Sequence, residues 1–105
     1  MEERTFQFAK HVSYLCKTLP RTVRNIEHVK QLIRSSGSVG VNYIEANGAL
    51  SKKDFLMRIK ICRKEAKESA YWLRLLIDCN SDQYTKEGIL LLNESIELKR
   101  FYRPY

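Results

Sequence analysis

The chain has 105 residues, of which 44% are hydrophobic and 30% are charged, and its formal net charge is +7 at pH 7. This length supports a single domain over residues 1–105, and the composition argues against disorder. Four glycines and two prolines are too few for the turn-rich layout of a β-sandwich, so long helices are favoured. The start of the chain lacks the features of a signal peptide, and no apolar run approaches the roughly 20 residues that span a bilayer. We therefore expect a cytoplasmic protein.

The positive charge is concentrated in two segments, residues 1–34 and 51–80, each of which carries a net charge of +4. Such a balance favours anionic partners, with nucleic acid ahead of a membrane surface. A soluble protein with a lysine-rich solvated face has the same composition. Charge alone therefore does not separate these two interpretations.

The first predicted helix runs from about Glu3 to Thr18 and ends before Pro20, which cannot continue a helix interior. Four apolar residues recur in it at helical spacing: Phe8, Val12, Leu15 and Leu19. The second predicted helix runs from about Thr22 towards Asn47. Its apolar and glycine positions repeat at threes and fours, as expected of a packed face: Ile26, Val29, Ile33, Gly37, Gly40 and Ile44.

A cluster of glycine and serine at residues 35–40 allows two interpretations. It is either a loop that splits the second helix, since each glycine costs about 1 kcal/mol in a helix, or a stretch of small side chains that lets another helix approach closely. The apolar spacing stays in phase on both sides of the cluster, which favours one continuous helix. The spacing of the glycines fits neither a Walker nor a dinucleotide-binding loop.

The third predicted helix, within residues 51–80, sorts its side chains onto three faces. Ser51 suits an N-cap, with Asp54 completing a variant of the capping box. An apolar stripe predicts the core: Phe55, Ile59, Cys62, Ala66, Ser69 and Leu73. The far side carries what we call the basic ridge: Lys53, Lys60, Lys64, Lys67 and Arg74. The remaining face, which we call the second face, is the expected contact between subunits: Ile61, Glu65, Glu68, Trp72 and Leu75.

The fourth predicted helix begins at Asp82 or Thr85 and ends near Phe101. One apolar stripe is formed by Ile89, Leu92 and Ile96, with Leu91 and Leu98 beside it. The tail, residues 100–105, is interpreted as a frayed end or a docking segment. Short connections between four helices predict an all-α fold, an antiparallel up-down-up-down four-helix bundle.

No motif in the sequence predicts catalysis, a cofactor or a metal site. His11 and His28 lie on different predicted helices, and the Glu-x-x-His motifs of di-iron bundles are absent. Cys16, Cys62 and Cys79 are far apart, which argues against a disulfide framework or a zinc site. We therefore expect a protein that is not an enzyme.

Two features of the second face each allow two interpretations. Glu65 and Glu68 are either an acid–base pair or, as the cost of burying an unpaired charge favours, a structural pair matched by a cation such as Arg34. Trp72 is either a core residue or an intersubunit contact.

Two stretches of the chain resemble a known bacterial family. They are residues 31–48 (QLIRSSGSVGVNYIEANG) followed by SKKDF at 51–55, and residues 61–76 (ICRKEAKESAYWLRLL); residues 91–98 are also similar to the family's last helix. The family is that of the "four helix bundle proteins", also called 23S rRNA-intervening-sequence proteins and once loosely labelled ribosomal proteins. The resemblance implies a bundle that assembles as a homopentamer. Related accessory proteins of diversity-generating retroelements are basic pentamers that bind nucleic acid and a reverse transcriptase.

The expected function is therefore binding of nucleic acid by a non-enzymatic, pentameric bundle, with RNA preferred to DNA. The partner would be structured RNA or an RNA–protein complex, held through its phosphates by the basic ridge. Three further cations are expected to add contacts: Arg21, Arg24 and Lys30. The alternative is a protein-interaction scaffold that docks an acidic partner, such as a reverse transcriptase or another protein, without binding nucleic acid. No membrane partner is expected.

Overall fold

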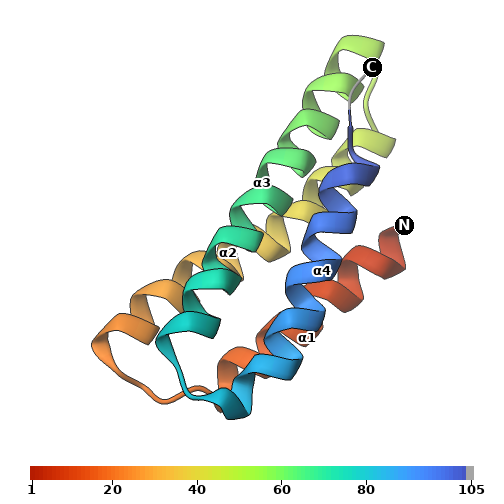
Figure 1. The fold of residues 1–105 in the computed structure, drawn as a ribbon. Helices are drawn as coiled ribbons and strands as arrows, with labels where there is room; N and C mark the ends of the chain where they lie inside the picture. The colour runs from red at the N-terminus through yellow and green to blue at the C-terminus, as the bar shows by residue number, and fades with distance from the viewer. Residues whose placement is uncertain (104–105) are drawn as a thin grey trace.

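The computed structural model describes residues 1–103 and contains four α-helices (Figure 1). They are α1 (Glu2–Thr18), α2 (Val23–Asn47), α3 (Lys52–Cys79) and α4 (Thr85–Phe101), with a short 3-10 helix at Asp82–Tyr84 before α4. The described residues contain no strand, so the predicted all-α class is confirmed. Of the predicted tail, Pro104 and Tyr105 lie outside the described residues.

Contacts between neighbouring helices run antiparallel, as predicted. Three contacts show this for successive helices: Thr5 near the start of α1 lies against Gly40 in the second half of α2, Asn25 near the start of α2 meets Asn80 just after α3, and Ile77 near the end of α3 lies against Gly88 near the start of α4. The hairpin of α2 and α3 is the longest part of the molecule, and its turn lies beyond the ends of α1 and α4 (Figure 1). The described helices include none that is both long enough and apolar enough to cross a membrane.

The starts of α2 and α3 are set by capping side chains. The hydroxyl of Thr22 accepts a hydrogen bond from the backbone N–H of Asn25, and the hydroxyl of Ser51 accepts one from the N–H of Asp54, both at 3.1 Å. These bonds satisfy N–H groups that have no partner within the helix. The predicted N-cap at Ser51 is therefore confirmed, and α2 is continuous through the glycine and serine cluster.

The predicted apolar stripe of α1 is confirmed, since its four residues are all buried. The predicted stripe of α3 is correct only for its C-terminal part, where Cys62, Ala66, Ser69 and Leu73 are fully buried. Phe55 is exposed and Ile59 is half-buried. These two residues belong to the part of α3 nearest the turn, where α1 and α4 offer less cover (Figure 1).

The predicted packed face of α2 is wrong for its isoleucines, since Ile26, Ile33 and Ile44 are each about half exposed, whereas Val29 packs against the core. The side of α2 that faces the core is instead mostly small or polar: Asn25, Leu32, Ser35, Ser36, Val39, Asn42 and Ala46. Ser35 and Ser69 explain this orientation. Their hydroxyls are fully buried and lie 2.8 Å apart across the α2–α3 contact, which only small side chains allow. The hydroxyl of Ser69 also donates to the carbonyl of Glu65.

At the end of the chain, too, the buried residues differ from the predicted ones. In α4, Leu91 and Leu98, which were predicted to lie beside the apolar stripe, are the buried residues. Ile89 of the predicted stripe is exposed, and the neighbouring Gly88 faces Ile77 of α3. Tyr102 is 1% exposed and packs near Tyr43, with ring centroids 5.9 Å apart. The expectation that the tail is frayed from residue 100 is therefore wrong for Tyr102, which belongs to the core.

The two glycines of the α2 cluster differ in what surrounds them. A Cβ at Gly40 would lie 3.0 Å from the side-chain oxygen of Thr5 in α1, so a larger residue there would push the two helices apart. A Cβ at Gly37 would meet nothing within 4 Å. Of these two glycines, only Gly40 is needed for the close approach of α1 to α2.

We predict opposite effects of alanine at these two glycines. Gly37→Ala should raise the free energy of unfolding by about 0.5–1 kcal/mol, because alanine loses less backbone entropy in a helix. Gly40→Ala should show no such gain, since Thr5 must move. Urea denaturation at one fixed protein concentration measures both, and an equal gain for the two variants would contradict the close contact.

Candidate nucleic-acid interface

The five cations of the basic ridge are all exposed and occupy one side of α3. From Lys53 to Arg74 they extend over about 32 Å at 1.5 Å per residue, most of the molecule's 46 Å length. Within residues 1–103, none of the five forms an ion pair. The ridge is therefore a row of uncompensated positive charge, as its spacing predicted.

Other arginines of α3 are engaged within the chain. Arg58 donates to the side-chain oxygen of Asn42 at 3.0 Å, and Arg63 donates to the backbone carbonyl of Lys99 at 3.2 Å. Arg58 thus joins α3 to α2, and Arg63 joins it to α4. The cations of α3 consequently separate into structural ones and the free ones of the ridge.

Tyr71 is a residue of this surface that the sequence analysis missed. It lies four residues after Lys67 and three before Arg74, so it shares the ridge's side of α3, and its side chain is 56% exposed. The ring packs edge-on against Trp72, with centroids 5.2 Å apart. Together with Arg74, Leu75 and Asp78, Tyr71 lines a shallow hollow of about 110 Å³. Its spacing from Lys67 and Arg74 was the signal in the sequence that could have identified it.

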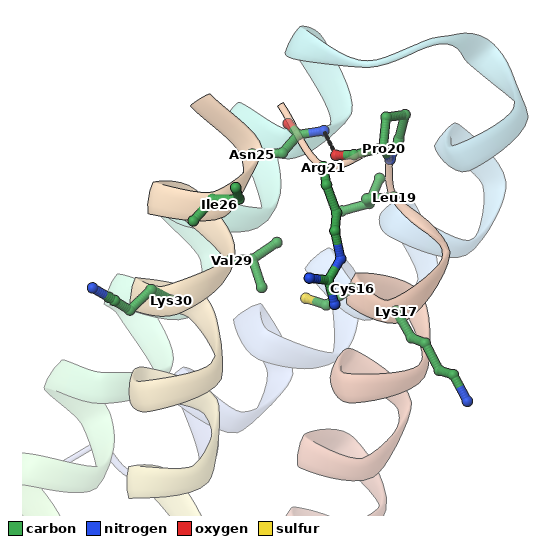
Figure 2. Close-up of a pocket in the computed structure, with 9 residues that line it drawn as sticks. All are labelled: Cys16, Lys17, Leu19, Pro20, Arg21, Asn25, Ile26, Val29 and Lys30. Atoms are coloured by element: carbon green, nitrogen blue, oxygen red, sulfur yellow. Dashed lines mark hydrogen bonds between the residues drawn. The ribbon is translucent and has the colours of Figure 1, made fainter. Parts of the chain in front are cut away.

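The three additional cations do not lie together. Arg24 donates to the backbone carbonyl of Cys79 at 3.2 Å, which places it at the C-terminal end of α3. Arg21 and Lys30 line a pocket between α1 and α2 instead (Figure 2). Participation of these three residues in nucleic-acid binding stays a prediction.

The two carboxylates of the second face are held by Arg34 of α2, the partner expected from the sequence. One guanidinium nitrogen lies 2.9 Å from the buried carboxylate of Glu65, and another pairs with Glu68. Partial burial by itself raises the pKa of Glu68, but the hydrogen bond and positive charge of Arg34 outweigh it and hold that pKa below its ordinary value. The arrangement fits a structural pair, since one guanidinium engages both carboxylates.

The rest of the second face lies largely along the contact with α2. Trp72 is half-buried against the core, and its ring centroid lies 5.8 Å from that of His28 in α2. Ile61 and Leu75 are also half-buried. Whether this face contacts another subunit stays a prediction.

Within the described part of the chain, no three histidine, cysteine or acidic side chains lie close enough to hold a metal ion. Cys16 and Cys62 are buried, and burial raises the pKa of each thiol to about 11. Both thiols are therefore protonated at neutral pH, as expected of small core residues.

Removal of Arg34 should be costly because Glu65 would remain buried without a counter-charge. We predict that Arg34→Ala lowers the free energy of unfolding by about 2–3 kcal/mol at pH 7. Because the folded pKa of Glu68 is lowered, the pair stabilises the fold above the unfolded carboxylate pKa of about 4.3 and loses this effect as pH falls through the folded value. The difference between wild type and variant should shrink at pH 3 in urea denaturation.

Arg4→Ala is the matched control for this prediction. Arg4 makes two 2.8 Å hydrogen bonds to the carboxylate of Glu94, but both side chains are partly exposed. Exposed pairs contribute about 1 kcal/mol or less. Equal losses for Arg4→Ala and Arg34→Ala would contradict the special cost that we assign to Glu65.

Comparisons with known proteins extend over nearly the whole chain. Residues 1–101 match the family model for the 23S rRNA-intervening sequence protein. The chain is also similar to the crystal structure of a protein of unknown function from the S23 ribosomal protein family of Bacteroides thetaiotaomicron. The two are 31% identical with a TM-score of 0.84, and the match covers 96% of this chain and 93% of that one. No curated protein matches the chain.

Proposed function

The chain belongs to the 23S rRNA-intervening sequence protein family, and we propose that it is an oligomeric, non-enzymatic protein that binds nucleic acid through phosphate contacts in the cytoplasm. The observation that carries this proposal is the basic ridge, whose five exposed cations have no ion-pair partner within residues 1–103. Phosphates would neutralise these cations and release counterions. The names of the family and of its S23 relative favour RNA over DNA.

The ridge favours recognition of backbone and shape over recognition of sequence. Lysine contacts to phosphates position a nucleic acid without reading its bases. The exposed ring of Tyr71 adds a surface on which one unpaired base can stack, next to Arg74. A structured RNA, with a helical segment beside an unpaired base, offers both features.

Assembly into an oligomer is supported by the outward face of α2. Along this face lie exposed apolar side chains with Gly37 between them: Ile33, Val41 and Ile44. An exposed apolar surface of this length is typical of an interaction site, and we propose a second copy of the chain as its occupant. Pentamers are what the family resemblance implies. This contact leaves the ridge on α3 open, so several ridges would bind one nucleic acid with increased avidity.

The second face of α3 is the weaker candidate for that contact. Glu65 is already engaged by Arg34, and Ile61 and Leu75 are half-buried within the chain. A ring needs two different surfaces on each subunit. The outward face of α2 supplies one of them, and the exposed remainder of the second face is a candidate for the other.

Reversing the charge of the ridge should abolish binding. We predict that the triple variant with Lys60, Lys64 and Lys67 changed to glutamate loses affinity for a labelled RNA hairpin, measured by fluorescence anisotropy. For the wild type, log affinity should fall with log salt with a slope of about −4.5 for five duplex phosphate contacts by one ridge. Retained binding by a folded triple variant would overturn the assignment.

A control variant makes the same change of charge elsewhere: Lys10, Lys17 and Lys86, all exposed and none on α3, changed to glutamate. It should bind more tightly than the ridge variant. Tyr71→Ala should weaken binding of a hairpin with an unpaired base more than binding of a plain duplex. An equal effect on both RNAs would contradict stacking on Tyr71.

Assembly is tested by the mass of the protein in solution. The wild type should sediment as a multiple of the 12.4 kDa chain, and Ile33→Asp should shift it towards the monomer, because a charge replaces an apolar contact. Ile89→Asp is the control, since Ile89 is similarly exposed but lies on α4. A wild type that sediments as a monomer at micromolar concentrations would contradict the proposed assembly.

A further inference from the structure

A pocket of about 300 Å³ lies where the end of α1 meets the start of α2 (Figure 2). Its walls are mainly apolar: Cys16, Leu19, Pro20, Ile26 and Val29. Three cations stand around it: Lys17, Arg21 and Lys30. Asn25 completes the lining, and no acidic residue contributes to it. Pockets that bind ligands or anchor side chains have such apolar walls with a few polar groups around them.

The pocket offers no free side-chain amide that would recognise a polar ligand edge. The amide nitrogen of Asn25 donates to the carbonyl of Pro20 at 2.9 Å and to the side-chain oxygen of Asn80 at 2.8 Å. Its own oxygen accepts from the amide of Asn80 at 3.0 Å. A nucleobase would thus find no free side-chain amide in the pocket, whereas an apolar side chain needs none.

The positions of the three cations indicate the charge of the occupant. Arg21 extends from the turn across the opening towards Cys16, while Lys17 and Lys30 point outward on opposite sides (Figure 2). None of the three forms an ion pair in the part of the chain that the structure describes. Cations separated in this way match several carboxylates around an apolar group better than one anionic head group.

We propose that this pocket binds an acidic segment of a partner protein, which inserts one aromatic or large aliphatic side chain between flanking carboxylates. The apolar anchor would fill the space between Leu19 and Val29, and its acidic neighbours would pair with Lys17, Arg21 and Lys30. The site goes beyond the nucleic-acid binding proposed for the basic ridge, because it is formed by α1 and α2 and shares no residue with the ridge. It assigns Arg21 and Lys30, two of the three additional cations, to a protein partner instead. One bundle would then hold a nucleic acid and a protein at the same time.

A labelled seven-residue peptide tests the proposal: one phenylalanine with three glutamates on each side, titrated with the full chain in fluorescence anisotropy at low salt. A matched peptide with alanine at the centre should bind with an affinity at least about 10-fold lower, because it lacks the buried aromatic side chain. Arg21→Glu should lower the affinity for the phenylalanine peptide by a similar factor. Arg74→Glu, which makes the same change on the ridge, should leave its affinity within about 2-fold.

Equal binding of the two peptides, or equal losses in Arg21→Glu and Arg74→Glu, would overturn the proposal, since attraction would then come from net charge alone. Absence of peptide binding, with RNA affinity lowered in Arg21→Glu, would overturn it in favour of a nucleic-acid contact. The ridge variant with three glutamates separates this test from the proposed function. It should lose RNA binding and keep the ratio between the affinities for the two peptides.

Discussion

The contact between α2 and α3 determines how the rest of the molecule is arranged. Ser35 and Ser69 meet at its centre, and because both side chains are small, the two helix backbones approach closely. The isoleucines of α2 lie outside this contact and are about half exposed. The same contact turns the core stripe of α3 inward and leaves the basic ridge on the open side. The apolar surface of α2 and the charged surface of α3 thus have one common cause.

Hydrogen bonding separates the arginines at the helix contacts from the lysines of the basic ridge. Arg34, Arg58 and Arg63 lie along the helix contacts and satisfy carboxylate, amide or carbonyl oxygens of neighbouring helices. These bonds hold the guanidinium groups at the helix contacts, so they are less free to turn towards an external anion. The ridge lysines have long flexible side chains and no such partners, which suits them to contacts with mobile phosphates.

Much of the fold was predictable from the sequence because its signals are local. Helix limits, the cap at Ser51, the period of the ridge and the pairing of Arg34 all depend on residue type and spacing along one or two helices. The orientation of α2 was not predictable in this way. A repeat of threes and fours gives the period of a helix but not the side that packs, and the stripe containing Ile33 was the more apolar one. Tyr102 enters the core through contacts with distant parts of the chain, which spacing does not reveal.

The reciprocal hydrogen bonds between Asn25 and Asn80 have a mechanical consequence. Each amide donates to the other across the open end of the α2–α3 hairpin, at 2.8 and 3.0 Å. A slip of either helix along the other by one turn, about 5.4 Å, would break both bonds and leave polar groups without partners. The longitudinal register of the hairpin is therefore locked at the end opposite its turn. In an assembly formed through α2, the basic ridge on α3 therefore keeps the same position along the helix axis relative to the subunit contact in every copy.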